Sequence, residues 1–301
     1  RLRRSGGLFK REEIMYSENF DYYRPSSLEE TIELLQKHDG ARILAGGHSL
    51  LPAMKLRLTA APALIDIGRI DSLRGIQSEN GAIHIGAMTT HAEIAESPVV
   101  QSDCPILSKT ASNIGDAQVR NRGTIGGSLA HGDPGADFPT VLLALSARIQ
   151  ATGPGGERTI GSSEFCTDMF TTALEPAEVL TSVTVPRLGK GVAGVYLKHH
   201  HPASRYAVVG VAVVVKLDGG KIDKVQLAVG GVSAYPVRCT NVETALVGKE
   251  PTAEALHEAA GRVSEAVRKP IGDFYASVDF RLHLAQVMAE RALKQAVEQA
   301  R

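Results

Sequence analysis

The sequence predicts an α+β fold in which two N-terminal subdomains precede a C-terminal domain with an antiparallel sheet. Residues 27–67 alternate between helical and strand patterns around a glycine-rich turn, which is typical of an α/β unit. Short strands and helices follow from residue 73, and long apolar strands with three helical patterns follow from residue 191. With 301 residues, 43% of them hydrophobic and 22% charged, the chain can bury a sizeable core.

The first helix is predicted directly after Pro25. The residues Ser27-Leu28-Glu29-Glu30 have the form of a capping box, in which a serine and a glutamate satisfy backbone N–H groups at the helix start. Leu28, Ile32 and Leu35 share one helical face, and Gly40 ends the helix. Apolar runs at 43–45 and 63–67 then predict two strands on either side of a glycine turn and a short helix.

From residue 72 the predicted elements are shorter. We expect strands at 73–76 and 83–85, helices near 90–96 and 105–114, a hairpin at 148–151 and 158–160, and a strand at 179–185. Further along, we expect strands at 195–198, 208–217 and 225–232, then helices that begin near Val242, Thr252 and Val278. These changes divide the chain into residues 15–71, 72–190 and 191–301.

The N-terminal residues 1–14 do not fit this pattern. They are basic and precede Met15, but they lack the apolar segment and cleavage site of a secretory signal. We interpret residues 1–14 as a tail or a cloning remnant, with Met15 as the natural start.

Composition excludes several classes of function. The 33 acidic and 33 basic residues cancel, so the chain lacks the positive charge that nucleic-acid binding needs. Its longest apolar run, residues 206–215, is about half of the roughly 20 residues that span a membrane. The 3 cysteines are scattered, which favours a reducing, cytoplasmic location and leaves too few thiolates for a four-cysteine metal centre.

Two glycine-rich turns are the strongest candidates for a binding site. They are Ala45-Gly46-Gly47-His48-Ser49-Leu50 and Arg122-Gly123-Thr124-Ile125-Gly126-Gly127-Ser128-Leu129-Ala130. Glycine allows close backbone approach, and successive free N–H groups form a concave anion site that suits a pyrophosphate. Neither turn matches the Rossmann or P-loop pattern. Each turn alone is a weak signal and is better explained by a structural role, whereas two such turns together could clamp one dinucleotide.

The surrounding residues make the interpretation specific. The segments AGGHSLLPAMKLRL at 45–58, QVRNRGTIGGSLAHGDPGADFPTVLLAL at 118–145 and GVYLKHHHPASRYAVVGVAV at 194–213 resemble the FAD-binding medium subunit of the molybdenum hydroxylase (xanthine dehydrogenase) family. The resemblance is greatest to the subunit of aerobic carbon monoxide dehydrogenases and runs from about residue 15 to residue 300. It implies a two-subdomain FAD-binding fold of the vanillyl-alcohol oxidase (PCMH) type, followed by a smaller C-terminal domain.

The resemblance also implies which residues bind the cofactor. The first turn would wrap the FAD pyrophosphate, the second would lie on its other side, and Ser49 and Thr124 could add hydroxyl donors. Asp137 would accept hydrogen bonds from FAD hydroxyls, and Leu180 would make a backbone contact. Tyr196 and Lys198 would approach the isoalloxazine ring, where an aromatic face can stack and a cation can stabilise a reduced flavin. The implied residues are Ala45, Gly46, Gly47, His48, Ser49, Leu50, Gly123, Thr124, Ile125, Gly126, Gly127, Asp137, Leu180, Tyr196 and Lys198.

Each of these residues has a simpler alternative. Tyr196 could be an ordinary strand aromatic, Lys198 a solvated charge and Asp137 a helix N-cap. His131, Asp133 and Asp137 could be drawn as a metal site, but they lack a ligand spacing. The run His199-His200-His201 replaces the arginine-rich stretch of many relatives and is interpreted as a polar strand end. Relatives in other branches attach FAD covalently through a histidine like His48, whereas in the molybdenum branch the link is noncovalent.

The implied function is that of an electron-transfer subunit. FAD on this chain would receive electrons from [2Fe-2S] clusters and pass them to an external acceptor. Because the chain has only 3 cysteines and no room for a molybdopterin domain, the clusters and the molybdopterin are expected on other chains. We expect a small iron-sulfur subunit and a large molybdopterin subunit, in a dimer of heterotrimers. In this role, the chain itself requires no catalytic acid or base and no metal. Carbon monoxide is the first expectation for the substrate of the large subunit.

Three alternatives remain open at this point. The chain could be a self-contained flavin-dependent oxidoreductase of the same fold, a scaffold that has lost FAD, or a hydrolase that uses Ser49 or Cys104 as its nucleophile. The hydrolase would need a nucleophile motif that the sequence does not contain. Flavin absorbance would separate a scaffold from the others, and neighbouring genes for partner subunits would separate the remaining two.

Overall fold

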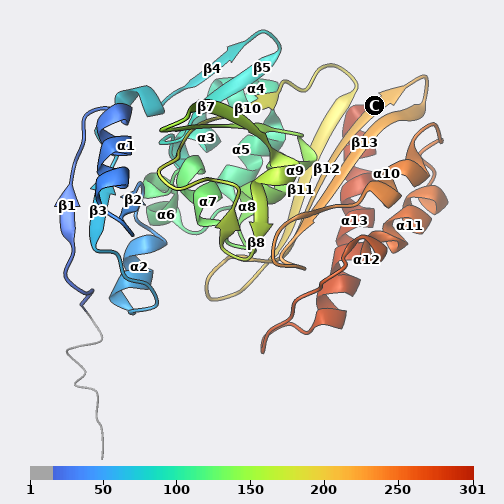
Figure 1. The fold of residues 1–301 in the computed structure, drawn as a ribbon. Helices are drawn as coiled ribbons and strands as arrows, with labels where there is room; N and C mark the ends of the chain where they lie inside the picture. Colours follow the sequence, from blue (N-terminus) through green and yellow to red (C-terminus); the bar gives the residue numbers. More distant parts are fainter. Residues whose placement is uncertain (1–15) are drawn as a thin grey trace, which may run out of the picture. The chain divides into compact units, whose positions relative to one another are not determined.

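The computed structural model describes residues 16–301, so the predicted tail at 1–14 lies outside the described residues. The chain divides into two compact units, of which the first ends at Asp71 and the second runs from Ser72 to Arg301. Figure 1 traces the elements of each unit along the chain. The further division of the second unit at residue 190 stays a prediction.

The first unit is built on a small parallel sheet. Its elements are β1 (Asp21–Tyr23), α1 (Leu28–Lys37), β2 (Arg42–Leu44), α2 (Leu50–Lys55) and β3 (Ala63–Asp66), with strand order β1-β3-β2. Both β1 and β2 pair with β3 in parallel, so the chain leaves all three strands at the same edge of the sheet. Strand β1 was not predicted from the sequence, because its three residues carry too little pattern.

The start of α1 differs in one detail from the predicted capping box. Ser27 accepts a hydrogen bond from the backbone N–H of Glu30, as predicted. The carboxylate of Glu30 accepts from the backbone N–H of Ser26 instead of that of Ser27. The cap therefore satisfies two donors, with the second one shifted by one residue.

The first half of the second unit contains an antiparallel sheet with strand order β4-β5-β10-β6-β7. After η1 (Asp71–Leu73), which begins at the last residue of the first unit, this half contains β4 (Ile76–Glu79), β5 (Ala82–Gly86), α3 (His91–Glu96), α4 (Pro98–Asp103), α5 (Pro105–Ser112), α6 (Ala117–Arg122), α7 (Ile125–His131), α8 (Asp137–Ala144), β6 (Arg148–Gly153), β7 (Gly156–Gly161), α9 (Ser162–Phe165), β8 (Cys166–Asp168), β9 (Thr171–Thr172) and β10 (Val179–Pro186). The predicted strand at 73–76 is wrong: residues 71–73 form a 3-10 turn, and pairing begins at Ile76.

The second half of this unit is a four-stranded antiparallel sheet, with strand order β11-β12-β13-β14, followed by helices. The elements are β11 (Val192–His200), β12 (Ala207–Asp218), β13 (Lys221–Gly230), β14 (Val237–Arg238), α10 (Thr240–Leu246), α11 (Ala253–Gly261), α12 (Val263–Ala266) and α13 (Val278–Ala300). The long helix α13 packs on β11 and β12, as Figure 1 shows. The predicted α+β fold class, with a C-terminal antiparallel sheet, is confirmed.

The long apolar run of the sequence is explained by β12, which is buried on both faces. Ala212 and Val214 belong to the core that contains α8, whereas Val211 and Val213 belong to the core that contains α13. A strand covered on both sides loses the alternation of apolar and polar residues. The run at 206–215 is therefore a central strand that joins two cores of the second unit.

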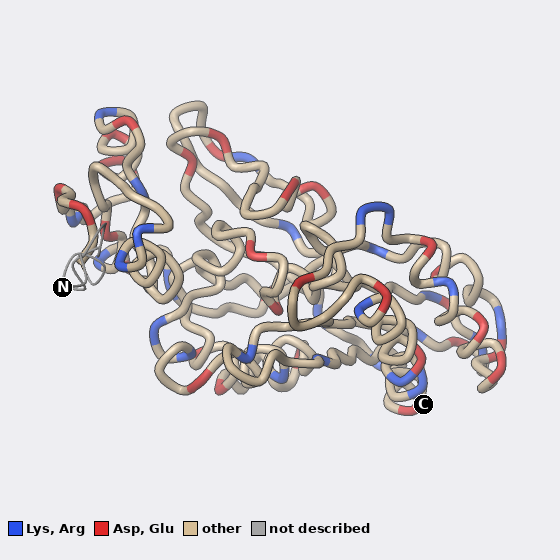
Figure 2. The backbone as a smooth tube through the Cα atoms, turned by 90° about the horizontal axis from the view of Figure 1, so that it is seen from below, with Lys and Arg blue, Asp and Glu red and all other residues tan. Residues whose placement is uncertain are grey.

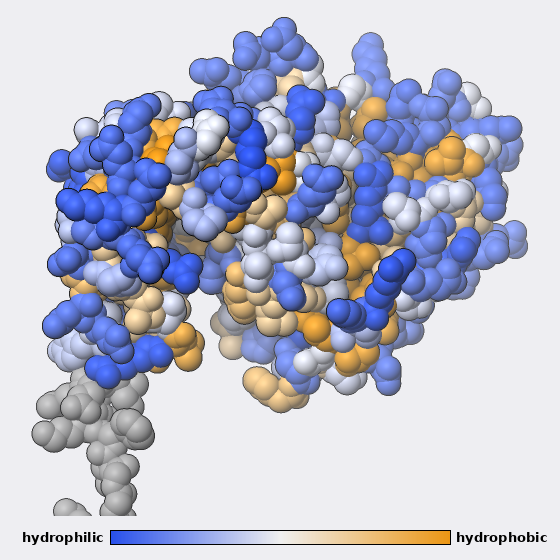
Figure 3. Space-filling view, viewed as in Figure 1, coloured by the Kyte–Doolittle hydropathy of each residue, from blue (hydrophilic) through white to orange (hydrophobic). Residues whose placement is uncertain are grey.

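The surface of the second unit shows no dominant charge. Figure 2 shows acidic and basic positions interspersed along its backbone, and Figure 3 shows a mainly hydrophilic face with small apolar groups. Among residues 16–301, no helix has the length and apolar character needed to cross a membrane.

Candidate cofactor site

The first glycine turn joins β2 to α2 and leaves its backbone donors open. The N–H groups of residues 45–50 find no hydrogen-bond acceptor among the described residues, and most of the turn is half-buried. Gly47 has φ +76°, a conformation that L side chains rarely adopt. A run of amides without internal acceptors is the backbone arrangement that binds anions.

Two side chains of this turn are also uncommitted. Ser49 is the N-cap of α2, yet its hydroxyl makes no capping hydrogen bond. His48 is exposed. The turn thus offers backbone donors and a hydroxyl on the same short segment.

The second glycine turn differs, because its backbone donors are used inside the protein. The N–H of Ile125 donates to the carbonyl of Thr89 at 3.1 Å, and that of Gly126 to the carbonyl of Ala87 at 2.9 Å. The N–H of Gly127 donates to the Thr124 hydroxyl, which caps α7. The N–H of Gly123 also has an acceptor, the carbonyl of Val119. Within residues 16–301, only the N–H of Thr124 in the predicted stretch 123–127 lacks an acceptor.

Close packing explains two glycines of this turn. A Cβ at position 126 would lie 2.6 Å from the Cβ of Ala87, and a Cβ at position 123 would lie 2.8 Å from Nε2 of His91. Both separations are shorter than real Cβ contacts, so any side chain would displace its neighbour. Gly126 therefore allows α7 to approach the segment between β5 and α3, and Gly123 allows the end of α6 to approach the first residue of α3.

Three predicted residues of the second unit come together in a buried cluster. The Tyr196 hydroxyl donates to Oδ1 of Asp137 at 2.6 Å, and Nζ of Lys198 donates to Oδ2 at 2.8 Å. The side chains of Asp137 and Lys198 are each only 6% exposed. Burial raises the pKa of Asp137, whereas the Lys198 ammonium and the Tyr196 hydroxyl act in the opposite direction. Burial also raises the pKa of Tyr196 well above its usual value, so the phenol stays a donor.

Leu180 lies on β10 and is buried at 5% exposure. The ladder between β10 and β6 is irregular between Leu180 and Ser182, and the intervening carbonyl of Thr181 accepts from the N–H of Ala87. Ala87 also holds Gly126 through its carbonyl. Leu180 is therefore linked through the backbone to the second glycine turn.

The residues considered as a metal site have other roles. Oδ1 of Asp133 accepts from the N–H of Gly135, and the ring of His131 packs against Phe170. Within residues 16–301, no three His, Cys, Asp or Glu side chains gather as a metal site would require. At the end of β11, His199 and His201 contact the rings of Phe280 and Tyr275.

The structure adds one candidate that the sequence analysis did not include. Tyr206 is 42% exposed, and a Cβ at Gly135 would lie 3.2 Å from its Cδ1. The next residue, Ala207, donates its N–H to the carbonyl of Gly135. Tyr206 thus presents an aromatic ring beside the loop that leads to Asp137. The sequence signal that could have indicated it is its position within the family-like segment 194–213.

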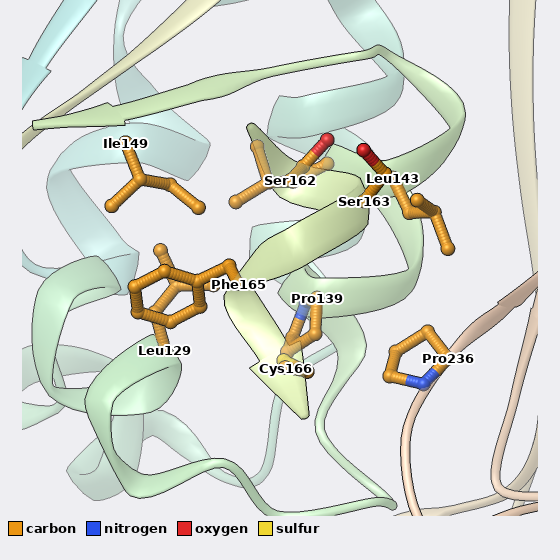
Figure 4. Close-up of a pocket in the computed structure, with 10 residues that line it drawn as sticks. Leu129, Pro139, Leu143, Ile149, Ser162, Ser163, Phe165, Cys166 and Pro236 are labelled. Carbon is orange, nitrogen blue, oxygen red and sulfur yellow. The ribbon is translucent and has the colours of Figure 1, made fainter. Parts of the chain in front are cut away.

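A pocket in the second unit is too small for a flavin. Side chains of α8, β6 and α9 line it, together with Pro236, as Figure 4 shows. Its accessible space is about 10 Å³, which is the room for roughly one water. Most of the residues that line it are apolar, and Cys166, whose pKa burial raises to about 11, stays a thiol there.

Comparison with known proteins places this arrangement in a family. Residues 18–188 match the FAD binding domain in molybdopterin dehydrogenase, and residues 195–296 match the CO dehydrogenase flavoprotein C-terminal domain. The carbon monoxide dehydrogenase medium chain of Hydrogenophaga pseudoflava is 39% identical over 94% of this chain and 98% of its own. The glyceraldehyde dehydrogenase medium chain of Sulfolobus acidocaldarius is 36% identical over 93% and 99%.

Solved structures agree. One similar structure is a carbon monoxide dehydrogenase from Hydrogenophaga pseudoflava, which is described as lacking the Mo-pyranopterin moiety of the molybdenum cofactor. It superimposes with a TM-score of 0.91 at 39% sequence identity, over 95% of this chain and 99% of that one. The similar proteins are named as chains or subunits of larger enzymes, which favours an electron-transfer subunit over a self-contained oxidoreductase. The resemblance that the motifs indicated is confirmed: the chain belongs to the family of FAD-binding medium subunits of the molybdopterin-dependent dehydrogenases, the molybdenum hydroxylases.

Proposed function

We propose that this chain binds one FAD noncovalently and carries electrons from iron-sulfur clusters on a partner chain to an external acceptor. The observation that carries the proposal is the run of backbone N–H groups at residues 45–50 that find no acceptor within residues 16–301, in a chain of an FAD-binding family. A pyrophosphate requires several donors at close range. This turn supplies six of them, from residues 45–50, without a metal or a large net charge.

The residues of the first turn fit the cofactor in a further way. Gly47 has φ +76°, and a Cβ there would lie 3.0 Å from Cδ1 of Leu51, so the shape of the turn depends on glycine. The Ser49 hydroxyl, which caps nothing, can add a donor. We propose that residues 45–50 hold the pyrophosphate.

In the second unit, we propose that residues 123–127, Asp137, Leu180, Tyr196 and Lys198 contribute to FAD binding. Most N–H groups of residues 123–127 donate to acceptors within the protein. The main role of this turn is therefore to position α7, and the N–H of Thr124 is its one donor without an acceptor among the described residues. The Lys198 ammonium is held by Asp137, so its charge lies at a fixed place. The exposed ring of Tyr206 is the better candidate for stacking, because Tyr196 is 9% exposed.

The mechanism that this chain performs is binding, orientation and electrostatic tuning. Bound FAD would supply the redox chemistry itself. The amides of residues 45–50 would fix the phosphates, and the Lys198 ammonium would favour negative charge nearby. No residue of this chain needs to act as an acid or base on the substrate.

The iron-sulfur clusters are proposed to lie on another chain. The sequence has only 3 cysteines, and burial raises the pKa of Cys104 and of Cys239 to about 12. Buried thiols that resist ionisation are poor cluster ligands. We therefore propose a small iron-sulfur subunit and a large molybdopterin subunit, in a cytoplasmic dimer of heterotrimers.

The substrate would be oxidised on the large partner subunit. The relatives include medium chains of both carbon monoxide and glyceraldehyde dehydrogenases, so this chain is compatible with more than one substrate. The identity of 39% to a carbon monoxide dehydrogenase medium chain makes carbon monoxide our first proposal.

The test begins with the purified protein and its flavin. A yellow protein with one FAD per chain is expected, and acid precipitation should leave the colour in the supernatant. Colour in the pellet would indicate a covalent link, with His48 as the residue to examine. Failure of the protein to bind FAD on reconstitution would disprove the proposed cofactor role. Purification of the chain alone as a fully active enzyme would disprove the proposal that it needs partner subunits.

A further inference from the structure

The cluster of Asp137, Tyr196 and Lys198 joins distant parts of the second unit. Asp137 is the first residue of α8, whereas Tyr196 and Lys198 lie on β11, on the same side of the strand. Both carboxylate oxygens are occupied, Oδ1 by the phenol at 2.6 Å and Oδ2 by the ammonium at 2.8 Å. One carboxylate therefore holds two positions of one strand.

Two helix ends support the buried charges. Asp137 lies in the first turn of α8, where the helix dipole favours a negative charge. Nζ of Lys198 also lies 3.4 Å from the carbonyl of Asn113, the C-cap of α5, where the dipole favours a positive charge. A buried ion pair is stable only when further dipoles and hydrogen bonds satisfy it, and these two helix ends provide them.

The ring of Tyr196 is part of the core. It belongs to the same apolar cluster as Phe138 and Leu142 of α8, and it packs over Gly210 of β12, where a Cβ would lie 3.2 Å from its Cζ. A ring enclosed in this way has no free face on which a planar ligand could stack. Its hydroxyl is directed to Asp137.

We propose that Asp137, Tyr196 and Lys198 form a clamp that fastens β11 to α8, and that Tyr196 is a positioning residue for the Lys198 ammonium. The clamp joins the region that matches the FAD-binding family, residues 18–188, to the region that matches the C-terminal family, residues 195–296. By orienting the carboxylate, Tyr196 fixes where the Lys198 ammonium lies. This inference rests on the proposed function for its effect on the flavin, whereas the clamp itself exists without cofactor.

The clamp is tested first in the apoprotein by a double-mutant cycle. Asp137→Asn and Lys198→Met should each lower the melting temperature by roughly 10 °C, since each leaves a buried partner unpaired. The melting temperature of the double variant should fall by clearly less than the sum of the decreases in the two single variants, because no buried charge is then left without a partner. Additive falls would overturn the clamp.

A milder variant keeps the test decisive if the charge variants fail to fold. Tyr196→Phe should lower the apoprotein melting temperature by about 4 °C, since it removes one donor from a buried carboxylate. Tyr235→Phe is the matched control, because Tyr235 is 41% exposed and its hydroxyl has no hydrogen-bond partner in the described part of the chain, where its backbone carbonyl accepts from Ser233. If Tyr196 merely stacked on the flavin, Tyr196→Phe would leave the apoprotein unchanged, and this result would overturn the proposal.

The positioning role requires a readout from the flavin. In the FAD-loaded protein, Tyr196→Phe should keep the affinity for FAD within about threefold of the parent but shift the midpoint potential of the flavin, whereas Tyr235→Phe should shift neither. An unchanged potential in Tyr196→Phe would overturn the positioning role. If the parent protein binds no FAD, the proposed function fails, and the apoprotein melting curves still decide the clamp.

Discussion

The two glycine-rich turns have similar sequences but opposite backbone arrangements. In the turn at residues 45–50 the N–H groups have no acceptor among the described residues. In the turn at residues 123–127, four of the five N–H groups donate to other residues of the second unit. The first turn is thus prepared to bind an anion, whereas the second is a packed junction that places a helix.

The difference shows that glycine serves two physical purposes in this chain. Gly47 adopts φ +76°, a backbone conformation that glycine allows and that L side chains rarely adopt. Gly126 has no such conformation and is required because a Cβ would lie 2.6 Å from the Cβ of Ala87. Variants that add side chains should therefore damage cofactor binding at the first position and folding at the second.

The largest expected effect is on folding, from Gly126→Val. A side chain at this position collides with Ala87, so the free energy of unfolding of the apoprotein should fall by about 3 kcal/mol, a loss of about 6–12 °C in melting temperature. Thermal denaturation measures it. Gly189→Val is the control, because a Cβ at position 189 meets nothing within 4 Å. A stable Gly126→Val apoprotein would show that the second turn is not a packed junction.

The next effect is on binding, from Gly47→Val. The strained turn should no longer present its amides to the phosphates, so FAD affinity should fall about 100-fold, equivalent to about 2.7 kcal/mol. Titration of the apoprotein with FAD measures this loss. Gly40→Val is matched in strain, because Gly40 has φ +74° at the end of α1, outside the turn. Equal losses in both variants would mean that strain, and not the turn itself, lowers the affinity.

Removal and return of FAD should distinguish the two turns without mutation. Amides at residues 45–50 should exchange hydrogen for deuterium rapidly in the apoprotein and at least tenfold more slowly with FAD, because the ligand supplies their acceptors. Amides at residues 125–127 should exchange slowly in both states, since their acceptors are internal. Peptide-resolved mass spectrometry can compare the two segments. Equal protection of both turns by FAD would contradict the distinction.

Local patterns allowed much of the fold to be predicted from the sequence. The start of α1 depends on residues three apart, and the long strands β12 and β13 depend on apolar runs, so both were recognised. The 3-10 turn at 71–73 was not predicted, because Leu73 is an apolar, buried residue, as in a strand, although it lies in a turn.

The site was predictable only in part. The motifs indicated the glycine turns and the residues Asp137, Tyr196 and Lys198, but they did not indicate that these three side chains bind each other. Tyr196 and Lys198 are 59 and 61 residues from Asp137, and the contact arises only when β11 packs beside α8. The acceptors for Gly126 and Ile125 lie in Ala87 and Thr89, also far away in the sequence, and were not predictable.

The smallest expected effect is on stability, from the N-cap residues Ser49 and Thr124, which precede α2 and α7. Thr124 caps α7 by accepting from the N–H of Gly127, so Thr124→Ala should lower the free energy of unfolding of the apoprotein by about 1 kcal/mol. Thr124→Ser, which keeps the hydroxyl, should restore most of it. Ser49 makes no capping hydrogen bond, so Ser49→Ala should change stability by less than about 0.5 kcal/mol. Urea denaturation of the three variants measures these differences, and a loss at Ser49 as large as that at Thr124 would show that both hydroxyls serve as caps.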